Sequence, residues 1–137
     1  MKILIAGLGS IGRRHLHNLA ALGQEDILLY RTHQSTLPDK DLATYPVEED
    51  LEKALAQKPD GVIISNPTAL HMDVALPAAK TGCHLLLEKP VADKLDQQVE
   101  ELIKIVETTG IKTLVGFQYR FHPVLAQIKD LIESMKI

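Results

Sequence analysis

Short apolar runs alternate along this chain with longer stretches in which apolar residues recur at helical spacing. The short runs are rich in Ile, Leu and Val at successive positions, which is typical of strands buried on both faces. The predicted strands are Ile3–Ala6, Ile27–Tyr30, Val62–Ser65, Leu85–Glu88 and Thr113–Phe117, with Ala43–Tyr45 as a weaker candidate. Because both faces of such strands must be covered, we expect helices on either side of a sheet.

The stretches between these runs carry apolar residues three, four, seven and eight positions apart, the spacing of one helix face. Four predicted helices follow the sets Gly12 to Gly23, Val47 to Leu55, Val99 to Val106 and Val124 to Met135. A fifth runs through His71 and Val74, with Thr68 as its expected N-cap. Alternation of strands and helices predicts the α/β class, with a doubly wound parallel sheet covered on both faces.

Composition excludes several classes of protein. The chain has 137 residues, 45% hydrophobic and 24% charged, which indicates one globular domain. A net charge of −3 argues against nucleic acid as a partner. No apolar run reaches the ~20 residues of a membrane span, and no signal peptide is recognisable at the start. One cysteine, Cys83, allows no internal disulfide and fits the cytoplasmic location that we expect.

The loop after the first predicted strand reads GLGSIG, with Gly7, Gly9 and Gly12 in the spacing G-x-G-x-x-G. Between a strand and a helix, this spacing is typical of dinucleotide binding. Gly7 is expected to permit the tight turn, Gly9 the approach of a pyrophosphate, and Gly12 close packing of helix and sheet. The amides of Ser10 and Ile11 would meet the phosphates. A glycine turn without a ligand is the alternative.

The end of the second predicted strand bears on the choice between NAD and NADP. NAD sites usually carry Asp or Glu there, bound to the ribose 2′-hydroxyl. Here Tyr30 occupies that place, followed by Arg31 and Thr32, with His33 and Ser35 as further hydrogen-bonding candidates. An arginine can pair with a 2′-phosphate that a carboxylate would repel. The sequence therefore favours NADP, with NAD as the alternative. If Arg31 binds no ligand, it is simply an exposed arginine in a variable turn.

The motif Glu88-Lys89-Pro90 follows the predicted strand Leu85–Glu88. Pro90 fixes its own φ and pushes Lys89 away from helical conformations, so the strand is expected to end with Lys89 at its mouth. An ammonium there can hydrogen-bond a substrate hydroxyl or carbonyl and pass a proton. A solvated loop lysine is the alternative. The histidines are scattered, and His15 and His17 point to different faces of a helix, so we predict no metal site.

Four motifs, GLGSIGRRH, SNPTALH, EKP and GFQYRFHP, occur in this order over essentially the whole chain. In order and spacing they resemble the nucleotide-binding half of the Gfo/Idh/MocA family (glucose–fructose oxidoreductase, inositol dehydrogenase, rhizopine catabolism). The resemblance implies an NAD(P)-dependent oxidoreductase acting on sugars, cyclitols and related compounds. Many relatives have Asp where this chain has Tyr30, which puts NAD use in doubt and leaves the family resemblance intact.

The resemblance also implies roles for single residues. Lys89 corresponds to the active-site lysine of the family, which contacts the hydroxyl that loses hydride. The residues implied to line the nicotinamide side or to lie near the dinucleotide are Asn66, Pro67, Thr68, His71, Glu88 and Gln118. Arg120 matches a position whose role varies within the family.

The resemblance further implies a second, substrate-binding domain. Residues 1–120 are expected to form the dinucleotide-binding domain, and residues 121–137 a helix that leads toward a C-terminal domain absent from this chain. We expect the chain alone to bind cofactor without turnover. Apolar side chains of the last helix, Leu125, Ile132 or Met135, would then be exposed and favour a homo-oligomer. A non-catalytic NADP-binding sensor or regulatory module is the alternative function.

Overall fold

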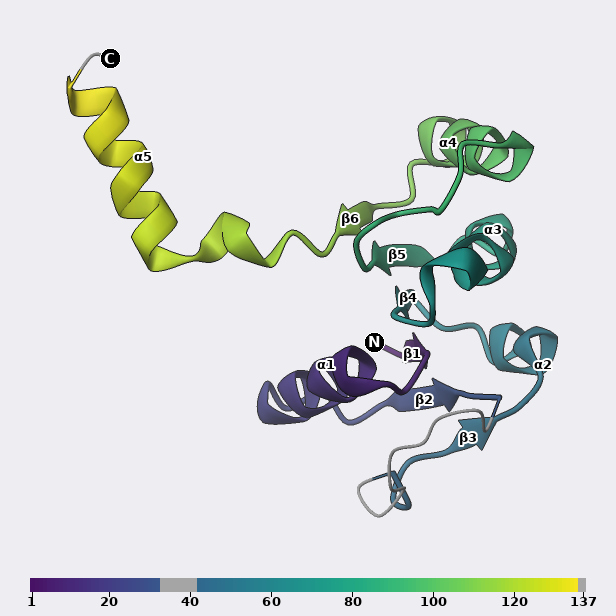
Figure 1. Cartoon of the computed structure of the whole chain (residues 1–137). Coiled ribbons are helices and arrows are strands. Elements are labelled where there is room, and N and C mark those ends of the chain that lie inside the picture. Colours follow the sequence, from purple (N-terminus) through teal and green to yellow (C-terminus); the bar gives the residue numbers. More distant parts are fainter. Residues whose placement is uncertain (33–41, 136–137) are drawn as a thin grey trace.

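A single parallel sheet forms the centre of the molecule (Figure 1). The computed structural model describes residues 1–32 and 42–135. Its strands follow the order β3-β2-β1-β4-β5-β6. They are β1 (Ile3–Ala6), β2 (Ile27–Tyr30), β3 (Val47–Glu48), β4 (Gly61–Ile64), β5 (His84–Leu87) and β6 (Thr113–Val115). The order reverses between β1 and β4, so the predicted doubly wound α/β fold is confirmed.

The described part of the chain has five α-helices, of which the first four cover the two faces of this sheet. They are α1 (Ser10–Ala21), α2 (Leu51–Ala56), α3 (His71–Lys80), α4 (Gln97–Thr109) and α5 (Pro123–Met135), with two 3-10 turns, η1 (Thr68–Leu70) and η2 (Gln118–Phe121). Figure 1 shows α1 on one face and α2, α3 and α4 along the other. Of the helices in the described part of the chain, none is both long and apolar enough to cross a membrane.

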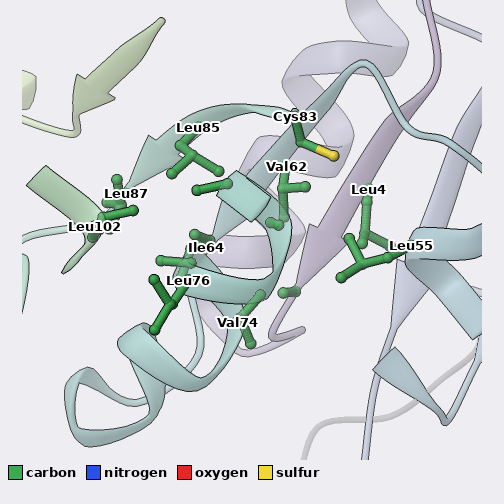
Figure 2. Close-up of a cluster of buried hydrophobic side chains, with 14 of the residues drawn as sticks. Leu4, Leu55, Val62, Ile64, Val74, Leu76, Cys83, Leu85, Leu87 and Leu102 are labelled. Carbon is green, nitrogen blue, oxygen red and sulfur yellow. The ribbon is translucent and has the colours of Figure 1, made fainter. Parts of the chain in front are cut away.

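The core divides into two layers because alternate residues of each strand point to opposite faces. Toward α2, α3 and α4, the buried cluster includes Leu4, Val62, Ile64, Leu85 and Leu87 from the strands and Leu55, Val74, Leu76 and Leu102 from the helices (Figure 2). Toward α1, the second cluster includes Ile3, Ile5, Ile27, Leu29 and Ile63 with Leu16 of the helix. Strands β1 and β4 are therefore buried on both faces along their whole length, as predicted, whereas Leu114 of the edge strand β6 is 65% exposed.

The third strand and second helix differ from the prediction. Ala43–Tyr45 lies in a turn, and the strand is Val47–Glu48 instead. Val47 therefore belongs to a strand, and α2 begins only at Leu51. The cause is Asp50, whose carboxylate accepts a hydrogen bond from the Lys53 N–H at 3.1 Å and caps the helix. Val47 has the same spacing to Leu51 as residues on one helix face, but it lies before the cap and outside the helix.

The start of the third helix also differs. Thr68 is not its N-cap but begins η1, and α3 follows from His71 without a side-chain cap. Gly23, Gly82 and Gly110 follow α1, α3 and α4 in the left-handed conformation common after helices, with φ of 77°, 87° and 74°. Because no side chain caps α3, His71 at its start is held by contacts of its ring, one of them with Val91.

The last helix stands away from the sheet (Figure 1). It runs Pro123–Met135, within the predicted range of residues 121–137. Apolar side chains along it are exposed, namely Val124, Leu125, Ile128, Leu131 and Ile132. The predicted exposure of Leu125 and Ile132 is therefore confirmed, whereas the side chain of Met135 lies outside what the structure describes.

Candidate functional site

The glycine loop lies at the point where the strand order reverses. Ala6, the last residue of β1, pairs with Ile64, the last residue of β4, and the two following loops leave the sheet there. Gly7 has φ +90°, and a Cβ on it would collide with the backbone of Asn66. A Cβ on Gly12 would collide with the Gly7 carbonyl oxygen. These two glycines therefore permit the turn and the close packing of α1 that their spacing predicts.

Gly9 faces open space. No described atom lies within 4 Å of where its Cβ would stand. Gly9 is also the N-cap of α1 and offers no side-chain cap, and the first turn of the helix carries no acidic residue. The N–H groups of Ser10 and Ile11 thus begin a helix whose positive dipole end has no side-chain partner at its cap. This arrangement fits the phosphates of a dinucleotide.

A buried polar atom adds to this fit. Among the described residues, Oδ1 of Asn66 is buried without a hydrogen-bond partner, while Nδ2 of the same side chain donates to the Leu70 carbonyl oxygen at 3.0 Å. A buried acceptor of this kind is normally paired in a folded protein. Because Asn66 packs directly against Gly7, the acceptor lies beside the glycine loop. A donor on a bound cofactor is one group that would satisfy it.

The two arginines after the loop differ in their surroundings. Arg13 is only 8% exposed, and its Nε donates to the Leu8 carbonyl oxygen at 3.0 Å. Arg14 is exposed. Arg13 therefore stabilises the backbone of the glycine loop through a buried hydrogen bond to Leu8. The sequence pattern alone does not indicate this role.

Tyr30 and Arg31 flank the glycine loop from β2. The Gly7 N–H donates to the Tyr30 carbonyl oxygen at 3.4 Å, and the Arg31 N–H donates to Glu48 in β3 at 3.1 Å. The side chains of Tyr30 and Arg31 are half-buried and Thr32 is exposed. The structure thus brings the predicted nucleotide-selecting residues next to the loop. His33 and Ser35 lie outside the described residues.

His71 is buried, at 1% exposure, instead of open to a ligand. Its Nε2 lies 2.9 Å from the Asn66 carbonyl oxygen and its Nδ1 3.2 Å from the Val91 carbonyl oxygen. Pro67 and Thr68 precede it at the surface of the same loop. His71 therefore links the loop after β4 to the loop after β5 through these two contacts. Its role is to stabilise the two loops, not to contact a ligand directly.

Glu88 and Lys89 follow β5 at the same edge of the sheet. Lys89 is exposed, as its predicted place at the strand mouth requires, and its peptide bond to Pro90 is cis. The Glu88 carboxylate is half-buried and lies 2.9 Å from Nε2 of His15. The candidate lysine and the phosphate-binding helix are thus connected through one carboxylate.

A small pocket of about 110 Å³ lies beside Lys89. Its walls come from Lys89 and from the segment after β6, namely Gly116, Phe117, Gln118 and Tyr119. The structure therefore brings Gln118 and Lys89 together, 29 positions apart in the chain. Phe117 and Tyr119 are 61% and 64% exposed, so this side of the pocket is open.

Sequence reasoning missed His15 and Gly116. His15 contacts Glu88 across 73 residues, and no local spacing announces such a pair. A Cβ on Gly116 would stand 2.9 Å from Oε1 of Glu88, so this glycine leaves room for the carboxylate. Within residues 1–32 and 42–135, no three His, Cys, Asp or Glu side chains are grouped to hold a metal ion.

Comparison with known proteins identifies the family of this chain. Residues 1–117 match the family model Gfo/Idh/MocA, described as an oxidoreductase family with an NAD-binding Rossmann fold. The chain is 31% identical over 127 residues to 4-carboxy-2-hydroxymuconate-6-semialdehyde dehydrogenase of Sphingobium, covering 90% of this chain and 40% of that one. It is 30% identical over 145 residues to scyllo-inositol 2-dehydrogenase (NAD(+)) of Bacillus subtilis, covering 100% and 41%.

A solved structure extends the comparison. The WlbA dehydrogenase of Bordetella pertussis, in complex with NADH and UDP-GlcNAcA, superposes with a TM-score of 0.84 at 26% identity, over 98% of this chain and 43% of that one. The chain spans about 40% of the length of the curated relatives named above. From the family match, which covers most of the chain, and from the glycine loop and strand order, the chain belongs to the Gfo/Idh/MocA family of oxidoreductases with an NAD-binding Rossmann fold.

Proposed function

We propose that this chain is the cofactor-binding part of an NAD(P)-dependent oxidoreductase that moves hydride between nicotinamide and a carbon bearing a hydroxyl or carbonyl in a sugar, cyclitol or related compound. One observation carries the proposal. Lys89 lies at the carboxyl end of β5, on the same sheet edge as a glycine loop whose surroundings fit phosphates. Relatives named for inositol and semialdehyde dehydrogenation support the substrate class.

Residues that follow five of the strands hold the cofactor in this proposal. The amides of Ser10 and Ile11, beside the open space at Gly9, bind the pyrophosphate. Tyr30, Arg31 and Thr32 contact the adenosine half at β2. The residues placed along the nicotinamide half are Asn66, Pro67, Thr68, Glu88 and Gln118, with His71 holding two of their loops together. NADP is the proposed cofactor and NAD the alternative, because Arg31 pairs with a 2′-phosphate and no carboxylate ends β2.

The chemistry assigned to this chain is a proton transfer. The nicotinamide ring supplies or accepts the hydride when the cofactor is bound. In the reducing direction, Lys89 hydrogen-bonds the carbonyl oxygen of the substrate and supplies the proton that completes the hydroxyl. In the oxidising direction, the same nitrogen takes that proton back. Lys89 is free to meet a substrate because its side chain is exposed beside the pocket formed with Gln118.

Residues 1–137 alone are proposed to bind cofactor without turning over substrate. Around Lys89, the described residues offer a pocket of only about 110 Å³, open on the side of Phe117 and Tyr119. A sugar-sized ligand is normally held by a larger cleft that encloses most of its surface. Oxidoreduction therefore requires surface beyond these residues.

The proposal is tested by titrating the chain with NADPH and with NADH, following nicotinamide fluorescence. Saturable binding of both is expected, tighter for NADPH. A parallel assay at 340 nm with a panel of sugars and inositols is expected to give no turnover. Absence of saturable binding to either nucleotide contradicts the cofactor proposal, and clear hydride transfer by the chain contradicts the second part.

A further inference from the structure

A histidine of the phosphate-binding helix contacts the carboxylate that precedes the candidate catalytic lysine. His15 lies in α1, one turn beyond the glycine loop, and its Nε2 is 2.9 Å from Oε1 of Glu88. Glu88 directly follows β5 and is bonded to Lys89. The contact therefore connects the helix proposed to bind the pyrophosphate with the strand end proposed to border the nicotinamide.

The Glu88 carboxylate is restrained on several sides. Besides the contact with His15, Oε2 accepts a hydrogen bond from the Lys89 N–H at 3.3 Å. A Cβ on Gly116 would stand 2.9 Å from Oε1 and 3.0 Å from Oε2, so glycine leaves the carboxylate its present place. The His15 and Glu88 side chains are 23% and 17% exposed. Partial shielding from water strengthens a hydrogen bond of this kind relative to one at the open surface.

The position of the pair assigns it to one half of the cofactor. In a doubly wound sheet the dinucleotide lies across the point where the strand order reverses, here between β1 and β4. Arg31 follows β2 on one side of that point, whereas Glu88 follows β5 on the other. An adenosine half bound at β2 places the nicotinamide half toward β4 and β5. The carboxylate held by His15 therefore borders the nicotinamide half.

We propose that His15 is a positioning residue for the nicotinamide half of the cofactor. It holds the Glu88 carboxylate at a fixed distance from α1, and thereby sets the spacing between the phosphate-binding amides and Lys89. The inference rests on the proposed cofactor binding. A merely structural role for His15 would affect both halves of the cofactor equally, whereas a positioning role affects the nicotinamide half alone.

The test compares two ligands that differ by the nicotinamide. NADPH contains it, and 2′-phospho-ADP-ribose lacks it; NADH and ADP-ribose form the parallel pair. His15→Ala is expected to weaken NADPH binding about tenfold, as for the loss of a hydrogen bond to a charged group, and to leave 2′-phospho-ADP-ribose within about twofold of wild type. His15→Gln, whose amide nitrogen can donate to Glu88, is expected to recover most of the NADPH affinity.

Further variants make the test specific. Gly116→Ala, which displaces the carboxylate, is expected to reproduce the His15→Ala pattern. His17→Ala, an exposed histidine two positions on, is expected to change neither affinity. The double variant His15→Ala/Glu88→Ala is expected to lose little more NADPH affinity than Glu88→Ala alone, because His15 acts only through that carboxylate.

The outcomes distinguish this inference from the proposed function. Equal losses for both ligands, unchanged NADPH binding, or additive losses in the double variant overturn the positioning role while leaving cofactor binding intact. Failure of the wild-type chain to bind NADPH and NADH overturns the proposed function and the inference with it. Thermal melting of each variant verifies that the fold is retained, and His15→Gln carries the test if His15→Ala unfolds.

Discussion

Gly9 and Gly12 stand three residues apart in one loop but differ in what surrounds them. A Cβ on Gly12 would overlap the Gly7 carbonyl oxygen and lie 2.7 Å from Oγ of Ser65, whereas a Cβ on Gly9 would meet nothing within 4 Å among the described residues. The first glycine therefore leaves space outside the protein, and the second lets two parts of the protein approach each other.

This difference predicts opposite effects of two alanine substitutions. Gly9→Ala is expected to change the free energy of unfolding by less than roughly 0.5 kcal/mol and to weaken NADPH binding at least about tenfold. Gly12→Ala is expected to destabilise the fold by about 1–3 kcal/mol or more, as overpacking does. Urea unfolding and NADPH titration of both variants check this. A destabilised Gly9→Ala with normal affinity would contradict the assignment of its open space to the pyrophosphate.

Arg31 carries the choice of nucleotide in this account. Arg31→Ala is expected to weaken NADPH binding by about 1.5–3 kcal/mol, the range for a hydrogen bond to a charged group, and to change NADH binding little. The two titrations serve as each other's control, because only NADPH carries the 2′-phosphate. Equal losses for the two nucleotides would mean that Arg31 does not read that phosphate.

The carboxylate of Asp96 caps the N-terminus of α4, and its contribution to stability depends on pH. Burial raises the pKa of Asp96, but hydrogen bonds from the Lys94 ammonium and from the N–H groups of Val99 and Gln98 outweigh it and hold this pKa below its ordinary value of 3.8. A lowered pKa in the folded state means that the carboxylate stabilises the fold above its ordinary pKa. That stabilisation is lost as the pH falls through the lowered value.

Asp96→Asn keeps a capping oxygen but removes this charge. The melting temperature of wild type is therefore expected to exceed that of Asp96→Asn at pH 7, and the gap is expected to shrink as the pH falls below about 4. Melting curves of both proteins between pH 7 and pH 3 measure it. A gap that stays constant or widens toward acid would show that the charge of Asp96 has no stabilising role.

The elements differ in how far the sequence predicts them. The buried strands are predictable because each is an uninterrupted apolar run, and the glycine loop is predictable because steric needs restrict its residues. The third strand is not, because Val47–Glu48 is a two-residue edge strand with little apolar content. Lys89 is likewise predictable from its motif. His15 meets Glu88 only because α1 packs on β1 and β4, close to the end of β5, and no local pattern of residues encodes this contact.

At the scale of the whole molecule, the candidate site and the last helix are separate. Segments after β1, β2, β4, β5 and β6 build the site at one sheet edge, whereas α5 stands apart from the sheet with its apolar side chains exposed (Figure 1). Stability and cofactor binding should therefore be independent of α5. We expect its exposed apolar residues to favour association between copies.

Removal of residues 123–137 tests this separation. The shortened chain is expected to melt within about 2 °C of wild type and to bind NADPH equally well. Any concentration-dependent association that sedimentation velocity detects in wild type is expected to weaken. A large fall in melting temperature would mean that α5 packs on the domain in solution.

The most direct test of the central claim is a map of backbone amide shifts during NADPH titration of the ¹⁵N-labelled chain, which at 15.2 kDa suits solution NMR. We predict the largest shifts at residues 9–12, 31–32, 66, 68 and 88–89, all at the carboxyl edge of the sheet, with α5 unaffected. Shifts confined to α5 or to the opposite edge of the sheet, or no shifts at all, would contradict the account.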